Sequence, residues 1–133
     1  MTRFVVDAGA VLEVVGAGIT VSDAHQLLAP TLIRSQALSR LHEAVSQGEL
    51  DEKTAREHLA AVGRLPIRLL GDSVLRRRAW TVADQLGWTS TYDAEYVALT
   101  VLHADALVTA DEEFAARVEG VVDTQPVEAL IRP

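Results

Sequence analysis

Three aspartates stand where an apolar segment of this sequence gives way to a helix. Asp7 follows the apolar run 4–6, and Asp111 comes shortly after the run 106–109. Asp93 opens a helical segment. Because parallel strands collect ligands at their carboxyl ends, these side chains are expected to converge there. Converging carboxylates repel one another until a cation neutralises them, and Mg²⁺ and Mn²⁺ prefer such oxygen ligands.

The same aspartates also have a simpler structural use. Asp7 and Asp111 are suited to helix N-caps, and Ser90-x-x-Asp93 has the spacing of a capping box. Each cap contributes about 0.5–2 kcal/mol to stability. Taken singly, each aspartate is better explained as a cap, whereas the three together favour a metal site.

The elements that position these acids follow from hydrophobic periodicity. Strands are predicted at 4–6, near Ala29, and at 66–70, 106–109 and 121–123. Helices are predicted at 8–15, 22–28, from Thr31, at 52–62, 73–86, 92–103 and 111–118, and after Pro126. Apolar strands alternating with helices predict an α/β fold with a mainly parallel sheet covered on both faces. The aromatic residues Trp80, Trp88 and Tyr96 are expected in the core.

The composition of the chain excludes several kinds of functional site. The 133 residues contain 49% hydrophobic residues, which predicts one globular domain spanning 1–133. The chain has no cysteine, which excludes thiolate metal sites and cysteine nucleophiles, and its four histidines lack metal-ligand spacing. The sequence shows neither an apolar stretch of about 20 residues nor a signal peptide, so a cytoplasmic protein without membrane insertion is expected.

Charge is distributed unevenly along the chain. The net charge is -7, yet residues 34–78 carry nine cations against six acids, and residues 79–133 carry two against ten. A basic segment beside an acidic site is compatible with a polyanion bound through metal ions. Arg34 and Arg40 flank the helix face of Gln36 and are the candidates for contact with the phosphates of such a polyanion.

Four segments together resemble a known family. They are Val5-Val6-Asp7, Ala29-Pro30, Thr91-Tyr92-Asp93-Ala-Glu-Tyr96 and Leu107-Val108-Thr109-Ala-Asp111. This pattern resembles the PIN-domain ribonucleases, and among them the VapC-type toxins of bacterial toxin–antitoxin pairs. The resemblance implies a three-layer α/β sandwich and a Mg²⁺- or Mn²⁺-dependent endoribonuclease. It also implies a cognate antitoxin, a homodimer, and catalytic and metal-binding roles for Asp7, Asp93 and Asp111.

One position departs from the family pattern. A glutamate is expected early in the helix after Ala29-Pro30, and this sequence has Gln36 there. Gln36, Thr109 and Glu95 are therefore considered as residues of the site rim. The alternative function is a catalytically weakened PIN domain that binds RNA or an antitoxin without efficient cleavage.

Overall fold

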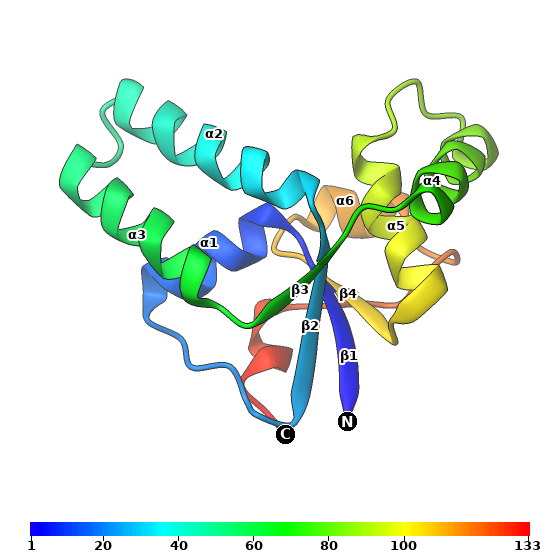
Figure 1. Cartoon of the computed structure of the whole chain (residues 1–133), viewed down its shortest axis with the longest axis horizontal. Coiled ribbons are helices and arrows are strands. Elements are labelled where there is room, and N and C mark those ends of the chain that lie inside the picture. Colours follow the sequence, from blue (N-terminus) through cyan, green and yellow to red (C-terminus); the bar gives the residue numbers. More distant parts are fainter.

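Five parallel strands form the centre of the molecule, in the order β3-β2-β1-β4-β5 (Figure 1). The computed structural model describes all 133 residues. The strands are β1 (Thr2–Val6), β2 (His25–Pro30), β3 (Ile67–Leu70), β4 (Ala106–Val108) and β5 (Thr124–Gln125). The chain therefore has the predicted α/β class with a parallel sheet.

Helices connect the strands, and local sequence signals define several of their ends. The helices are α1 (Ala8–Ala17), α2 (Leu32–Ser46), α3 (Glu52–Arg64), α4 (Ser73–Leu86), α5 (Tyr92–His103), α6 (Glu112–Arg117) and the short 3₁₀ helix η1 (Val127–Leu130). The Asp72 carboxylate accepts a hydrogen bond from the Leu75 N–H at the start of α4. Gly87 ends the same helix with a φ of 69°, in the left-handed region that glycine favours.

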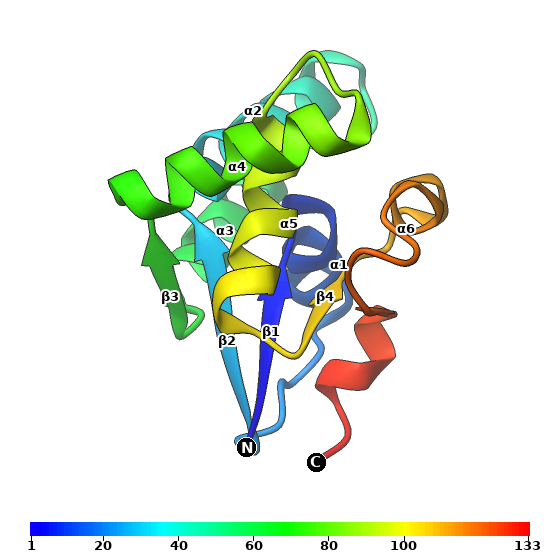
Figure 2. The ribbon, with the colours of Figure 1, turned by 90° about the vertical axis from the view of Figure 1, so that its right-hand side faces the viewer.

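The helices cover both faces of the sheet. Figure 1 shows α1, α2 and α3 on one side of the strands and α4 and α5 on the other. Figure 2 shows α5 lying across the sheet, with α4 crossing above it near the ends of the strands. This is the three-layer sandwich that the sequence predicts.

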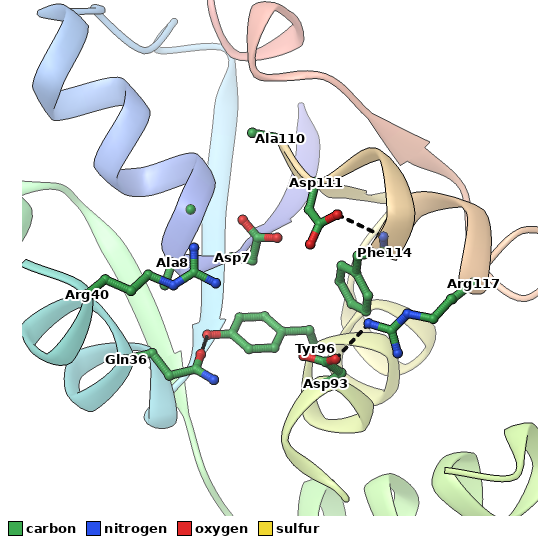
Figure 3. A pocket seen from close by; sticks show the side chains of 11 residues that line it. Asp7, Ala8, Gln36, Arg40, Asp93, Tyr96, Ala110, Asp111, Phe114 and Arg117 are labelled. Atoms are coloured by element: carbon green, nitrogen blue, oxygen red, sulfur yellow. Dashed lines mark hydrogen bonds and ion pairs between the residues drawn. The ribbon is translucent and has the colours of Figure 1, made fainter. Parts of the chain in front are cut away.

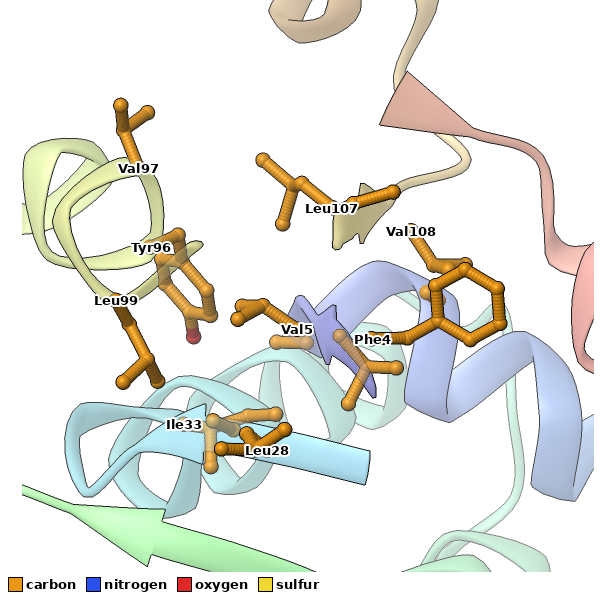
Figure 4. Packing of buried hydrophobic residues seen from close by; sticks show 14 of the residues in the cluster. Phe4, Val5, Leu28, Ile33, Tyr96, Val97, Leu99, Leu107 and Val108 are labelled. Carbon is orange, nitrogen blue, oxygen red and sulfur yellow. The ribbon is translucent and has the colours of Figure 1, made fainter. Parts of the chain in front are cut away.

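The core lies between α5 and the sheet and continues to α1 on the other face. Figure 4 shows Leu99 of α5 facing Val5 of the central strand, with Leu107 beside it. All three residues are fully buried. Burial of this apolar surface is the main favourable term in folding and fixes the position of α5 on the sheet.

Two predicted elements are wrong. Residues 22–28 are predicted to be helical, with a strand only near Ala29, but the strand β2 spans His25–Pro30 and pairs with β1 on one side and β3 on the other. Two flanking strands that satisfy its backbone hydrogen bonds outweigh its local preference. Residues 121–123 are not a strand; β5 follows them and consists of Thr124–Gln125.

The aromatic residues divide between core and surface. Tyr96 is buried and Trp88 packs partly against the core, as predicted. Trp80 is 69% exposed, so its expected place in the core is wrong. It lies one position after Ala79, which points inward from α4, and its side chain therefore turns outward.

No helix of this structure is both long enough and apolar enough to cross a membrane.

Candidate active site

The order of the strands brings the ends of β1 and β4 together. The chain adds β2 and β3 on one side of β1 and then returns to place β4 on its other side. Val6 pairs with Val108, so Asp7 and Thr109 leave the sheet at the same level. This is a topological switch point, where open parallel sheets form a crevice for ligands.

A cavity of about 220 Å³ lies at this point. Asp7, Asp93 and Asp111 all line it, although they come from three separate segments of the chain. Figure 3 shows Asp7 and Asp111 close to the ends of β1 and β4, with Asp93 at the start of α5. The other lining residues with polar side chains are Gln36, Arg40, Tyr96 and Arg117.

Asp7 is held at the start of α1. Its Oδ1 accepts a hydrogen bond from the Ala10 N–H at 2.8 Å, so the predicted capping role is confirmed. Burial raises the pKa of Asp7 above its usual value, and the charge of Asp111 acts in the same direction. The Thr109 hydroxyl, the Ala10 N–H and Arg40 lower the pKa and only partly offset burial. Arg40 therefore compensates the charge of an ionised Asp7 only in part.

Asp111 is the N-cap of α6, also as predicted. Its Oδ1 accepts hydrogen bonds from the N–H groups of Glu113 and Phe114 at 3.0 and 3.1 Å. The Asp111 N–H donates to the hydroxyl oxygen of Thr109 at 3.1 Å. Thr109 is buried and contacts both Asp7 and Asp111, so it positions the two acids and does not itself line the cavity.

Asp93 forms an ion pair with an arginine. Arg117 Nη2 lies 2.9 Å from Asp93 Oδ2, and both side chains are about half exposed. The Arg117 guanidinium also stacks on the rings of Trp88 and Phe114, at 5.1 and 5.3 Å. The rings and the carboxylate hold the guanidinium at the edge of the cavity.

The predicted capping box at Ser90 and Asp93 is wrong. Helix α5 begins after Thr91, and the Ser90 hydroxyl accepts from the Tyr92 N–H, not from Asp93. Asp93 is thus free of a capping role and can face the cavity.

Gln36 lies on α2 and faces Tyr96 of α5. The Tyr96 hydroxyl donates to Gln36 Oε1 at 2.5 Å. Burial raises the pKa of Tyr96, so this hydroxyl keeps its proton and remains a donor. The carbonyl oxygen that Gln36 could offer to a metal is therefore already engaged.

Two of the other candidates lie outside the cavity. Glu95, expected at the rim, is two positions after Asp93, which turns it about 200° around α5. It does not line the cavity and lies near Arg76, whose charge partly offsets the rise in the pKa of Glu95 caused by burial. Arg34 is exposed and does not line the cavity either, whereas Arg40 does.

The sequence did not predict three of the lining residues as members of a site. Arg117 and Phe114 lie on α6, which Asp111 caps, and Tyr96 was assigned only to the core. The spacing of Phe114 and Arg117 places them on one helix face just after a candidate ligand, and this is the one signal in the sequence that could have identified them.

The donor set fits a hard divalent cation only in part. The cavity contains carboxylates and no softer ligand, and Arg40 offsets the charge of Asp7 only in part. However, no three acidic side chains lie close enough together to hold one metal ion. Asp7 and Asp111 are the pair best placed to do so, since Arg117 engages Asp93.

Comparison by sequence identifies no relative: no family model matches the chain, and neither does any curated protein. Solved structures do resemble it. PAE2754 from Pyrobaculum aerophilum aligns with a TM-score of 0.74 and 27% identity, over 98% of this chain and 93% of that one.

Two further structures define the fold. VapBC2 from Rickettsia felis, solved bound to a DNA fragment from its promoter, aligns with a TM-score of 0.64 and 8% identity, covering 93% of this chain and 98% of that one. A PilT N-terminus domain protein, SSO1118 from Sulfolobus solfataricus P2, aligns with a TM-score of 0.51 and 17% identity, covering 97% of this chain and 90% of that one. The chain therefore has the fold of PilT N-terminus (PIN) domains, as the resemblance implied.

Proposed function

We propose that this protein is a metal-dependent endoribonuclease, the toxin of a toxin–antitoxin pair. The observation that carries the proposal is the cavity at the switch point of the sheet, which Asp7, Asp93 and Asp111 line from three segments of the chain. Acidic residues gathered at that edge of a PIN-like fold suit the hydrolysis of a phosphodiester that a cation holds.

Asp7 and Asp111 would hold Mg²⁺ or Mn²⁺, joined by Asp93 once Arg117 releases it. When bound, the cation supplies the positive charge that activates water and stabilises the leaving oxygen. The Thr109 hydroxyl forms hydrogen bonds with both Asp7 and Asp111 and so holds the two residues in place relative to each other. The caps on α1 and α6 fix the rotamers of these two aspartates, which reduces the reorganisation that cation binding requires.

The partners are part of the proposal. The fold is shared with VapBC2, and this supports a small antitoxin that covers the acidic cavity. Arg117 already pairs with Asp93 within the chain, so a cationic side chain of an antitoxin would find Asp7 and Asp111 as its free partners. A homodimer in the cytoplasm completes the proposed assembly.

The direct test is cleavage of single-stranded RNA by the purified protein with Mg²⁺, Mn²⁺ or EDTA. We expect cleavage with either metal, none with EDTA, and a loss of at least about 100-fold in the Asp7→Asn variant. Asparagine still caps α1, so the fold is retained. Binding of RNA without cleavage under all conditions would favour the weakened PIN domain instead.

A further inference from the structure

One wall of the cavity differs in character from the acidic side. Gln36 and Arg40 are one helical turn apart on α2 and both line the cavity. Figure 3 shows Arg40 beside Asp7 and Gln36 beside the Tyr96 hydroxyl, across the cavity from Asp111. This wall contributes nitrogen donors where the other contributes carboxylates.

Gln36 is oriented as a donor. Its Oε1 accepts the Tyr96 hydrogen bond, and its amide nitrogen has no partner within the protein. An amide whose oxygen is engaged presents two N–H groups. A glutamate in this place would present only acceptor oxygens, so the departure from the family pattern reverses the hydrogen-bonding character of the wall.

Arg40 is a cation without an ion pair. The two ion pairs of the structure join Arg56 to Glu52 and Arg117 to Asp93. The guanidinium of Arg40 lies against Gly9, with Nη1 only 3.0 Å from the place that a Cβ on Gly9 would occupy. Glycine at this position leaves the room that lets Arg40 reach the cavity.

We propose that Gln36 and Arg40 form a phosphate-binding subsite, which holds a phosphate group of an RNA strand against the α2 wall. The choice of RNA rests on the proposed function, whereas the phosphate follows from the donors themselves. Arginine binds phosphate through two parallel N–H groups, and the amide of Gln36 adds a third donor one turn away. Arg117 neutralises Asp93 on the opposite side, which reduces repulsion of the incoming phosphate.

The test measures binding in EDTA, where no metal bridges the strand and no cleavage occurs. The probe is a short, fluorescein-labelled single-stranded RNA, titrated by anisotropy at several salt concentrations. Arg40→Gln is expected to weaken binding about three- to tenfold and to flatten the slope of log K against log salt by about 0.7. Arg64→Gln is the matched control, because it removes the same charge from the last residue of α3, which does not line the cavity.

Two further variants test separately the position of the Arg40 guanidinium and the charge at residue 36. Gly9→Ala retains the charge of Arg40 but places a methyl group 3.0 Å from its Nη1, so the guanidinium must shift, and binding is expected to weaken less than in Arg40→Gln. Gln36→Glu is expected to weaken RNA binding in EDTA about threefold or more, because a carboxylate replaces the donor. Gln47→Glu adds the same charge beyond the end of α2 and serves as its control.

Several outcomes would overturn the subsite. One is an effect of Arg40→Gln no larger than that of Arg64→Gln. Another is unchanged RNA binding by Gln36→Glu, and a third is equal binding of a poly-glutamate peptide. If Arg40→Gln binds normally while the wild type cleaves RNA through Asp7, the subsite fails and the nuclease stands. If the variants lose binding but no metal supports cleavage, the nuclease fails and the subsite stands.

Discussion

At the scale of single residues, the site is defined by which oxygen or nitrogen each side chain leaves free. Asp7 and Asp111 each use Oδ1 for a helix cap. Asp93 uses Oδ2 for Arg117, and Gln36 uses its carbonyl oxygen for Tyr96. Capping and metal binding, which the sequence presents as alternatives, are therefore compatible, because each carboxylate has a second oxygen.

Gln36→Glu tests what the amide does to metal binding. We expect the variant to bind Mn²⁺ about tenfold more tightly, or about 1.4 kcal/mol, because a carboxylate adds negative charge near the cation. The Tyr96 hydroxyl can donate to the new carboxylate as it does to the amide. Isothermal titration with Mn²⁺ measures the change, with Gln47→Glu as control. Lower stability without a change in metal affinity would mean that this side chain does not face the acidic cluster.

Arg117→Gln tests the ion pair on Asp93. Removing the guanidinium frees a carboxylate for the cation, so we expect the affinity for Mn²⁺ to rise about three- to tenfold. Loss of a half-exposed ion pair and of the aromatic contacts should lower the free energy of unfolding by about 1 kcal/mol.

Arg56→Gln breaks the exposed pair with Glu52 and is the control for this measurement. A fall in metal affinity for Arg117→Gln would instead show that Arg117 holds Asp93 in its working position. Titration with Mn²⁺ and urea denaturation distinguish the two results.

At the scale of elements, α2 presents Gln36 and Arg40 to the cavity, so the junction that begins this helix sets their place. Thr31 precedes α2, and its N–H donates to the Leu70 carbonyl at the end of β3 at 3.0 Å. A Cβ on Gly71 would lie only 2.7 Å from Thr31 Oγ1. Glycine is required here by close contact with a stiff β-branched side chain.

Gly71→Ala is accordingly expected to lower the free energy of unfolding by about 1–3 kcal/mol in urea denaturation. The double variant with Thr31→Ala removes both atoms nearest the new methyl group and should recover most of the loss. Gly63→Ala is the matched control: it stands in α3 with open space around it, and it should stabilise by about 0.4–1 kcal/mol. An equal loss at both positions would contradict the proposed contact.

At the scale of the whole molecule, the acidic cavity couples metal binding to folding. A cation that binds only the native state stabilises it by mass action. We expect the melting temperature to rise with Mg²⁺ or Mn²⁺, and the triple variant of Asp7, Asp93 and Asp111 to Asn to lose that rise. Asparagine retains the caps of α1 and α6, so the fold itself is preserved. Scanning calorimetry with and without metal measures the melting temperatures of the wild type and the variant. An equal rise with metal in both proteins would contradict a shared site.

Much of the fold was predictable because the signals for its elements are local. Helix α4 begins at the cap on Asp72 and ends at Gly87, and both signals lie within one turn of the helix end. The alternation of apolar strands and helices predicted the parallel sheet, because buried strands need covers on both faces. The rule that parallel sheets bind ligands at the carboxyl ends of their strands then identified Asp7 and Asp111 as candidates.

Only the tertiary structure shows the features that depend on contacts between residues far apart in the sequence. Strand β2 was predicted only near Ala29, and its first residues are extended because β1 and β3 pair with their backbone. Arg117 meets Asp93 from 24 positions away, and Tyr96 meets Gln36 from 60. A cap is a hydrogen bond within one turn and can be predicted from the sequence, whereas these contacts form only after packing against the sheet brings the helices together.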